Sequence, residues 1–324
     1  MTKATLNELE SAAELVYRHF PATPQYCWPL LSQRAGCEVW VKHENHTPVG
    51  AFKLRGGLTY IAARDAAGDR RGMITATRGN HGQSIATAAG LFGMKVTIVV
   101  PKGNSVEKNA AMQAQGGELV EYGDDFQESA EYAQARAADE GLFMLPSFDP
   151  LLVQGVGTYA LELLRAQPDL EAVYVPIGMG SGICGVISAR DALGLKTRVY
   201  GIVAEGAPSY ALSFEAGHPV NTNSAVTMAD GMACRSPNAA ALEIIRAGAE
   251  DVLIVGDAEI EEAMRIYYTD THNVAEGAGA APLAGLLKQK EKHAGGKAGV
   301  ILTGGNVDMG LFARVLADVA PSAA

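Results

Sequence analysis

Short runs of β-branched residues alternate along the chain with alanine-rich segments in which apolar positions recur every three to four residues. The short runs predict strands near residues 38–44, 72–78, 95–101, 118–123, 142–147, 172–177, 198–204, 251–256 and 298–304. The longer segments predict helices, among them 56–67, 82–93, 105–116, 127–141, 155–167 and 257–270. This alternation is typical of α/β proteins with mostly parallel sheets flanked by helices.

Nine predicted strands in 324 residues suggest two sheets rather than one. Residues 65–140 form a self-consistent βαβαβ pattern, so we expect them to make a small α/β domain. We expect residues 1–64 and 141–324 to make a larger, discontinuous domain. A cleft between two such domains is a frequent place for a ligand.

Charge and composition narrow the range of partners. The net charge is −10 and the pI is about 5.2, which argues against nucleic acid or an anionic membrane as a partner and leaves a small molecule. No apolar run approaches the length of a membrane span, and the first residues read as an amphipathic helix, so we expect a cytoplasmic protein. The four cysteines have neither metal nor redox spacing and are expected to be reduced thiols: Cys27, Cys37, Cys184 and Cys234.

One lysine lies in an apolar, glycine-flanked stretch, VGAFKLRGG, at residues 49–57. Desolvation beside Phe52 would disfavour the ammonium form of Lys53, lower its pKa and make the amine a better nucleophile. The alternative is a lysine that extends its ammonium to solvent from the start of a helix.

Four glycine-rich loops follow predicted strands or separate predicted elements, at residues 77–84, 178–182, 229–233 and 302–306. Glycines before a helix let backbone amides approach an anion at the positive end of the helix. Each loop alone has an ordinary explanation as a turn or a helix cap. Together they predict a site for one planar, anion-bearing cofactor next to Lys53.

A rival interpretation comes from residues 180–185, which match the dinucleotide pattern G-x-G-x-x-G, with Glu205 about twenty residues further on. The match lies in the middle of the chain, whereas such a motif usually begins its nucleotide-binding unit. An NAD-linked oxidoreductase therefore stays as a lesser alternative.

Six motifs, in order along nearly the whole chain, resemble those of fold-type II pyridoxal-phosphate (PLP) enzymes, in the branch of threonine/serine dehydratases and serine racemases. The motifs are KHENHTPVGAFKLRGG, TRGNHGQS, GMGSG, MADGMACR, VAEGAGAAPLAGLL and LTGGNVD. The resemblance implies a two-domain fold like that of the tryptophan synthase β subunit, PLP as cofactor and a homodimer.

The resemblance also implies a role for each matching residue. Lys53 is the expected Schiff-base lysine, with Phe52 beside the ring. The other expected cofactor contacts are Asn80 at the pyridine 3-hydroxyl, Gly178, Met179, Gly180, Ser181 and Gly182 around the phosphate, Gly231 as a wall, Glu276 nearby and Thr303 at the pyridine nitrogen. The loop expected to hold the substrate carboxylate comprises Thr77, Arg78, Gly79, Asn80 and His81.

These roles imply an elimination reaction. PLP supplies the electron sink, and the freed amine of Lys53 can take the Cα proton. A neutral hydroxyl such as that of Thr303 does not keep the pyridine nitrogen protonated, which favours loss of a β-leaving group. We therefore expect a dehydratase that converts a β-hydroxy amino acid to a 2-oxo acid and ammonia.

Arg78 departs from the family pattern. Racemising relatives usually carry a serine there as acid/base, and arginine is a poor proton donor at neutral pH, so we expect little racemase activity. A guanidinium binds a carboxylate through two parallel hydrogen bonds, so we expect 3-hydroxyaspartate as substrate. Alternatively, Arg78 only pins its loop by an ion pair. His43 and His46 either add polar contacts or are structural.

Two further departures concern regulation. Val203 stands where relatives have an acidic metal ligand, so we expect the divalent-cation site to be lost or altered, with Glu205 the only acidic candidate nearby. No long extension follows the last motif, so we expect no amino-acid feedback domain.

Three other functions stay open. They are an ordinary threonine/serine dehydratase, a β-replacement synthase of the cysteine-synthase type, and a PLP- or nucleotide-binding regulatory protein without catalysis. Lys53 and Thr303, both intact, argue against the last.

Overall fold

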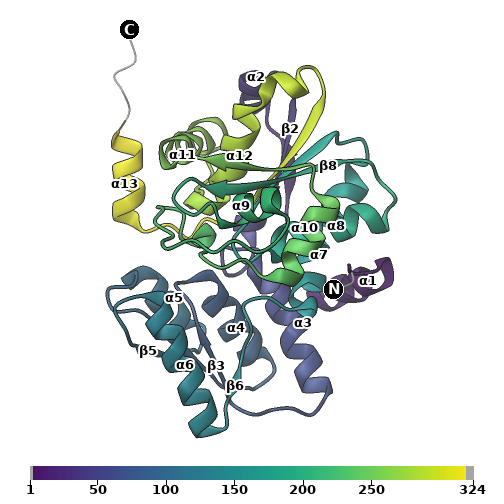
Figure 1. The fold of residues 1–324 in the computed structure, drawn as a ribbon. Coiled ribbons are helices and arrows are strands. Elements are labelled where there is room, and N and C mark those ends of the chain that lie inside the picture. The colour runs from purple at the N-terminus through teal and green to yellow at the C-terminus, as the bar shows by residue number, and fades with distance from the viewer. Residues whose placement is uncertain (1–2, 319–324) are drawn as a thin grey trace.

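A computed structural model describes residues 3–318, which fold into two lobes (Figure 1). The larger lobe is built on a six-stranded sheet that is parallel except for β1, which runs antiparallel to β2. Its strand order is β1 (Gln25–Cys27), β2 (Glu38–His43), β10 (Lys297–Leu302), β7 (Ala172–Pro176), β8 (Arg198–Ala204) and β9 (Asp251–Val255).

The smaller lobe is built on a four-stranded, all-parallel sheet. Its order is β5 (Glu118–Glu121), β4 (Val96–Val100), β3 (Met73–Ala76) and β6 (Phe143–Met144). The two sheets confirm the predicted α/β class. The division at residues 65 and 140 stays a prediction, and β6 pairs with β3 just beyond it.

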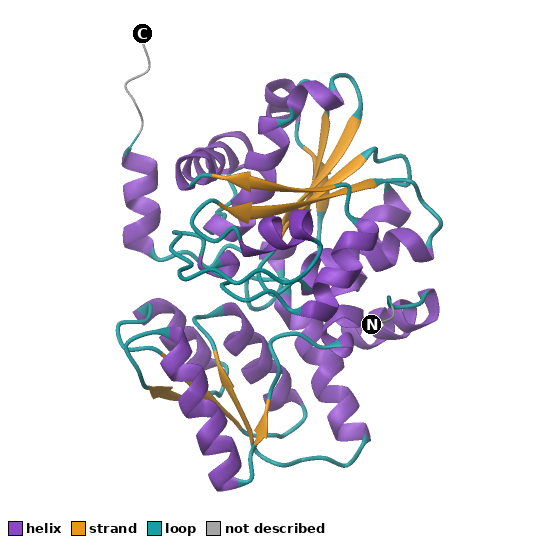
Figure 2. Ribbon diagram, viewed as in Figure 1, coloured by secondary structure: helices purple, strands orange, loops and turns teal. Residues whose placement is uncertain are grey.

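Helices flank both sheets (Figure 2). They are α1 (Leu6–Tyr17), α2 (Pro29–Ala35), α3 (Lys53–Ala66), α4 (Asn80–Leu91), α5 (Val106–Ala114), α6 (Phe126–Glu140), α7 (Pro150–Ala166), α8 (Ser181–Ala192), α9 (Ser209–Ala216), α10 (Ala239–Gly248), α11 (Asp257–Thr271), α12 (Gly277–Lys288) and α13 (Met309–Ala317). Short 3-10 turns are η1 (Glu44–His46), η2 (Asp230–Met232) and η3 (Lys290–His293).

One predicted strand is shorter than expected, and one observed strand was not predicted. The strand expected at 142–147 has only two residues, because Pro146 has no N–H to continue the ladder. The short edge strand β1 was not predicted, since three residues with one exposed tyrosine carry no clear periodicity.

Helix α3 connects the two lobes. Its first residue lies at the larger sheet, while Leu54, Leu58 and Ile61 are buried in the core of the smaller lobe. Glycines permit the close approach: a Cβ on Gly57 would lie 2.3 Å from Ser84 Oγ of α4, and one on Gly155 of α7 would lie 2.3 Å from the Arg55 carbonyl oxygen. The start of α3 is therefore fixed by contacts with both α4 and α7.

A buried charge network, formed by Lys42, Glu44, Arg55 and Glu162, holds α3 from behind. Arg55 donates from Nε to Glu44 Oε2 (2.7 Å) and from Nη1 to Glu162 Oε1 (2.7 Å). Lys42 donates to Glu162 Oε2 (2.5 Å) and to the carbonyl of Thr23 (2.7 Å). Two cations and two carboxylates balance, which makes burial of all four tolerable.

Candidate active site

Three neighbouring parallel strands end at the same edge of the larger sheet. The strands β2, β10 and β7 lead into residues 44–53, 303–306 and 178–182, respectively. Ligands of open α/β sheets bind at the carboxyl ends of their strands. The topology thus brings three of the predicted motifs to one place.

Backbone pairing fixes the position of Lys53. The N–H of Phe52 donates to the Thr303 carbonyl (2.9 Å), and the N–H of Gly305 donates to the Gly50 carbonyl (3.0 Å). Between them, Ala51 and Gly304 form an antiparallel bridge. Lys53, the first residue of α3, is thereby held beside the end of β10.

The amine of Lys53 is partly buried and has no polar partner. Its Nζ lies 4.7 Å from the centre of the Phe52 ring, and no hydrogen bond or ion pair within residues 3–318 engages it. Burial lowers the pKa of Lys53, and the carboxyl of Glu276 partly opposes this shift. A larger neutral fraction makes this amine a better nucleophile than a solvated lysine.

The loop at residues 178–182 exposes backbone rather than side chains. A Cβ on Gly178 would lie only 2.1 Å from the Gly231 carbonyl oxygen, and Gly180 has φ +99°, which favours glycine. Tyr210 braces the loop by donating from its hydroxyl to the Met179 carbonyl (2.9 Å). Helix α8 starts at Ser181, so the loop presents backbone amides at the positive end of a helix of 12 residues.

Asn80 and Glu276 meet between the lobes. Asn80 Nδ2 donates to Glu276 Oε1 (2.7 Å), and Asn80 Oδ1 accepts from Asn306 Nδ2 (2.8 Å). Asn306 also donates to the Val49 carbonyl (2.9 Å). The chain Asn306–Asn80–Glu276 therefore ties the start of α4 to the loop after β10 and to the start of α12.

Glu276 is a titratable carboxyl in this site, with 8% of its surface exposed. Burial raises the pKa of Glu276 to about 7, although Lys108, the Asn80 hydrogen bond and Lys53 favour its ionised form. A carboxyl with such a pKa changes charge near neutral pH.

Two other polar groups of the site have no partner within the described part of the chain. The buried Nε2 of His81 has no hydrogen bond, and none engages the hydroxyl of Thr303. Burial and the charge of Lys53 lower the pKa of His81 to about 3, so its ring is neutral at physiological pH. Buried polar groups without partners indicate a missing ligand.

These features fit PLP. An amine without partners, Lys53, can bond the aldehyde carbon, and the glycine loop before α8 can hold a phosphate. The free hydroxyl of Thr303 can meet the pyridine nitrogen, and Gly231 lacks a side chain that would fill the space. The roles of the individual residues stay predictions.

Arg78 lies in the loop between β3 and α4, and its side chain is exposed. No ion pair within residues 3–318 engages its guanidinium, so no salt bridge pins the loop. The Arg78 carbonyl accepts a hydrogen bond from Asn104 Nδ2 (3.3 Å). The charged side chain of Arg78 is exposed, whereas the side chains of Asn80 and His81 are partly buried.

His43 and His46 belong to an aromatic cluster at the edge of the larger sheet. His43 Nε2 accepts a hydrogen bond from Trp28 Nε1 (3.0 Å), and its ring stacks on that of His46 with 5.1 Å between centres. Burial lowers the pKa of His43 to about 4, and His46 bonds Asn273 (2.9 Å). Both histidines therefore have structural partners.

Residues 3–318 contain neither a cluster of metal ligands nor a membrane span. Val203 is buried in β8, and no group of three or more His, Cys, Asp or Glu side chains there is placed to hold a metal ion. No helix among the same residues combines the length and the apolar character that crossing a bilayer requires.

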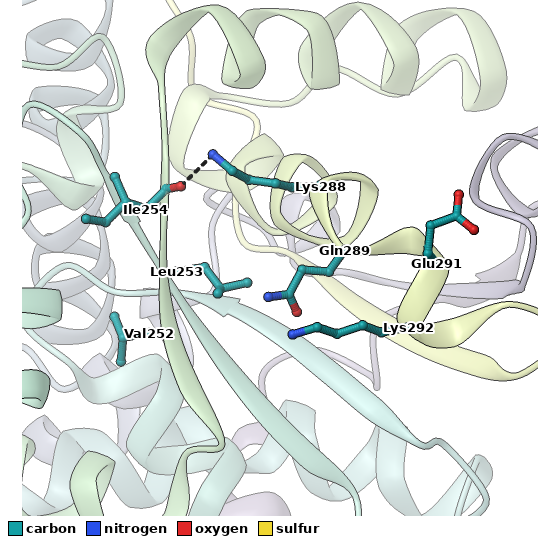
Figure 3. A pocket seen from close by; sticks show the side chains of 7 residues that line it. All are labelled: Val252, Leu253, Ile254, Lys288, Gln289, Glu291 and Lys292. Carbon is teal, nitrogen blue, oxygen red and sulfur yellow. Dashed lines mark hydrogen bonds between the residues drawn. The ribbon is translucent and has the colours of Figure 1, made fainter.

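A surface hollow of about 590 Å³ lies away from this site, at the free edge of β9 (Figure 3). Lys288 donates there to the Ile254 carbonyl (3.1 Å) and to Glu259 (3.1 Å), which covers part of the open strand edge. Its lining includes surface lysines and apolar side chains but none of the predicted site residues.

Sequence reasoning missed several residues of this site. Asn306 stood within a quoted motif but received no role, although a polar side chain after a glycine pair is a usable signal. Ser84 donates to the Lys53 carbonyl (2.6 Å), and Lys108 reaches Asp230 (2.8 Å). A lysine on an amphipathic helix gives no sign of a contact with a distant loop.

Comparison with known proteins places the chain. The family model described as "Pyridoxal-phosphate dependent enzyme" matches residues 16–304. An L-threonine ammonia-lyase of Geobacter sulfurreducens is 36% identical over 86% of this chain and 69% of its own length. An L-threo-3-hydroxyaspartate ammonia-lyase of a Pseudomonas species is 32% identical over 98% of this chain and 99% of its own.

A solved structure supports the same placement. Maize serine racemase is 27% identical and superposes with a TM-score of 0.91, covering 98% of both chains. The site geometry, the family model and these relatives agree with the resemblance found in the sequence. The protein belongs to the family of pyridoxal-phosphate dependent enzymes.

Proposed function

We propose that this protein is a PLP-dependent lyase that eliminates water from a β-hydroxy amino acid, with 3-hydroxyaspartate as the preferred substrate. The observation that carries the reaction class is the pairing of a partly buried lysine without polar partners, Lys53, with the neutral hydroxyl of Thr303 at the next strand end. Iminosuccinate forms on loss of water and hydrolyses to oxaloacetate and ammonia.

Each group of the site has a different role in the proposed reaction. When bound, PLP supplies the electron sink that makes the Cα proton acidic. Lys53 takes that proton at Nζ, since burial keeps a larger share of its amine neutral. The loop at residues 77–81 holds the α-carboxylate at the start of α4, where backbone amides favour an anion. Thr303 offers a hydroxyl rather than a carboxylate, which favours departure of the β-hydroxyl group.

The choice of 3-hydroxyaspartate rests on Arg78. Its guanidinium has no ion-pair partner within residues 3–318 and follows Thr77 in the substrate loop, so it is available for a second carboxylate. The relative named L-threo-3-hydroxyaspartate ammonia-lyase, aligned over nearly the full length of both chains, supports this choice. The relative named L-threonine ammonia-lyase favours the second candidate, a general threonine/serine dehydratase.

The test is the rate of 2-oxo acid release by PLP-loaded protein from the 3-hydroxyaspartate stereoisomers, L-threonine and L-serine. We expect one hydroxyaspartate isomer to have the highest kcat/KM. Arg78→Ala should lower that value by about tenfold or more and the value for L-serine much less, because a charged hydrogen bond is worth about 1.5–3 kcal/mol. Arg71→Ala, at an exposed arginine of the same lobe, is the control.

Two results would change the proposal. If L-threonine or L-serine has the highest kcat/KM, the protein is a general dehydratase and Arg78 is not a specificity residue. If L-serine and D-serine interconvert at a rate near that of elimination, the expectation of little racemase activity fails.

A further inference from the structure

Lys108 of α5 reaches from the smaller lobe to the larger one. Its Nζ donates to Asp230 Oδ2 in η2 (2.8 Å). Its stem lies against the substrate loop, since a Cβ on Gly79 would be 2.9 Å from Lys108 Cδ. Lys108 therefore lies against Gly79, in the loop that carries Arg78.

Lys108 also lines a recess of about 40 Å³ between the lobes, together with Gly231, Glu276 and Asn306. One water molecule needs about 10–15 Å³ on this scale, so the recess has room for a group the size of a carboxylate. It can take the end of a small substrate that is held by the loop at residues 77–81.

The two side chains of the Lys108–Asp230 ion pair differ in solvent exposure. The lysine side chain is 13% exposed and the aspartate 41%. An ammonium has three donors, and Asp230 accepts the one hydrogen bond that Lys108 makes to residues 3–318. Asp230, the exposed partner, can turn into solvent when an incoming carboxylate replaces it as the acceptor of Lys108. Lys108 is held in place by its stem.

Lys108 is not needed to keep α5 docked. Ser105 donates to Asp308 Oδ1 (2.5 Å), and the N–H of Met309 donates to Glu107 Oε1 (3.0 Å). These two contacts join the first turn of α5 to the start of α13 without Lys108. The contact between α5 and α13 therefore does not use the ammonium of Lys108.

We propose that Lys108 is a specificity residue that binds the distal carboxylate of a dicarboxylic substrate, in exchange for Asp230. The inference rests on the proposed function, because the amino acid must first be held by the loop at residues 77–81. Three carboxyl groups also line the recess, those of Asp230, Glu276 and Asp308. Without Lys108 the recess would repel an anion, so Lys108 is the cation of the recess itself, and Arg78 of the neighbouring loop can contribute to the same carboxylate.

The test compares malate with lactate as ligands of the PLP-loaded protein, by isothermal titration calorimetry. The two share a 2-hydroxy acid and differ in the distal carboxylate. We expect wild type to bind malate more tightly, and Lys108→Met to reduce the malate-to-lactate affinity ratio about tenfold or more, as for loss of a charged hydrogen bond. Lys102→Met is the matched control, since Lys102 pairs with Asp124 on the outer surface of the same lobe.

Asp230→Asn gives the opposite expectation. Removal of the competing carboxylate should raise the affinity for malate several-fold and change that for lactate less. If Lys108→Met and Asp230→Asn instead weaken both ligands equally, the pair only joins the lobes and the inference is overturned. No preference for malate in wild type overturns it too.

Failure of the proposed function is distinguishable from failure of this inference. If the wild type does not turn over 3-hydroxyaspartate but selects malate through Lys108, the proposed substrate is wrong and the role of Lys108 holds. If 3-hydroxyaspartate is turned over and Lys108→Met leaves the malate-to-lactate ratio unchanged, the role of Lys108 is wrong and the proposed substrate holds.

Discussion

Lys42 and Lys53 are two lysines of the larger lobe whose pKa is lowered by burial, but their surroundings differ. Lys42, in the buried charge network, donates to Glu162 and to the Thr23 carbonyl. Lys53 lies at the start of α3 against the ring of Phe52 and has no polar partner among the described residues.

The difference separates a lysine that stabilises the fold from a lysine that can take part in a reaction. A buried charge with two acceptors is held in its ionised form and in one position, so it contributes to the fold. In a buried amine without acceptors the neutral form, with its lone pair available, is favoured relative to a solvated lysine. Arg55 connects the two regions, since it belongs to the network and follows Lys53 by two positions.

The strongest way to sharpen the comparison is Lys53→Ala. We expect turnover to fall by about 10⁴-fold or more, because the proton acceptor at Cα is lost. The thermal unfolding temperature of the protein without cofactor should not fall, since Lys53 makes no polar contact there. A variant that keeps measurable turnover would mean that another base takes the proton.

Arg55→Met should have the opposite effect to Lys53→Ala, because it should lower stability. It leaves Glu44 and Glu162 with too little positive charge in a buried place, and we expect the free energy of unfolding to fall by about 3–5 kcal/mol. Urea denaturation followed by circular dichroism measures this. Arg71→Met is the exposed control, and an equal loss in both variants would contradict the role of the network.

Glu276→Gln tests the charge balance around Lys53 through pH. The pKa of Glu276 is raised from 4.5 to about 7 in the folded protein, so the folded state holds this proton more tightly than the unfolded state does. The contribution to stability is therefore full below about pH 4.5 and is lost as the pH rises through 7, up to about 3 kcal/mol. The measurement is urea denaturation of the protein without cofactor at several pH values.

The glutamine variant should lack this part of the pH dependence. The pKa of Glu276 also depends on four neighbours, Lys53, Lys108, Asp230 and Asn80. The comparison with wild type separates the effect of the carboxyl from the effects of these neighbours. Identical pH profiles of the two proteins would show that Glu276 does not titrate in this range.

Tyr17→Phe is the mildest test of the network. The Tyr17 hydroxyl donates to Glu162 Oε1 (2.9 Å) from a partly exposed position. We expect a loss of about 1 kcal/mol in the free energy of unfolding and no change in turnover. A larger loss in turnover than in stability would mean that the network acts on Lys53 more directly than its geometry suggests.

Much of the fold, and the loops that form the candidate site, were accessible from sequence, because both depend on local patterns. Strands such as β4 are continuous buried runs, and the loop before α8 needs glycine at Gly178 and Gly180 for steric reasons. Lys53 was noticeable because of its apolar neighbours.

The contacts that were not predicted join residues far apart in the chain. Asn80 bonds Glu276 across 196 positions, and Lys108 bonds Asp230 across 122. No periodicity encodes such pairs, since each partner satisfies its own helix or loop. The ion partners of Arg55 were hidden for the same reason: a charged residue in a helix usually faces water.

The contact between Gly178 and Gly231 has a consequence for how such a site can diversify. A methyl group on Gly178 would collide with the Gly231 carbonyl oxygen at 2.1 Å, and one on Gly231 would lie 3.0 Å from Ala278 Cβ. Substitution of Gly178 is thus closed, whereas substitution of Gly231 requires Ala278 to move by a few tenths of an ångström. New substrate preferences therefore arise more readily at positions that already carry long charged side chains in or beside the substrate loop, such as Arg78 and Lys108.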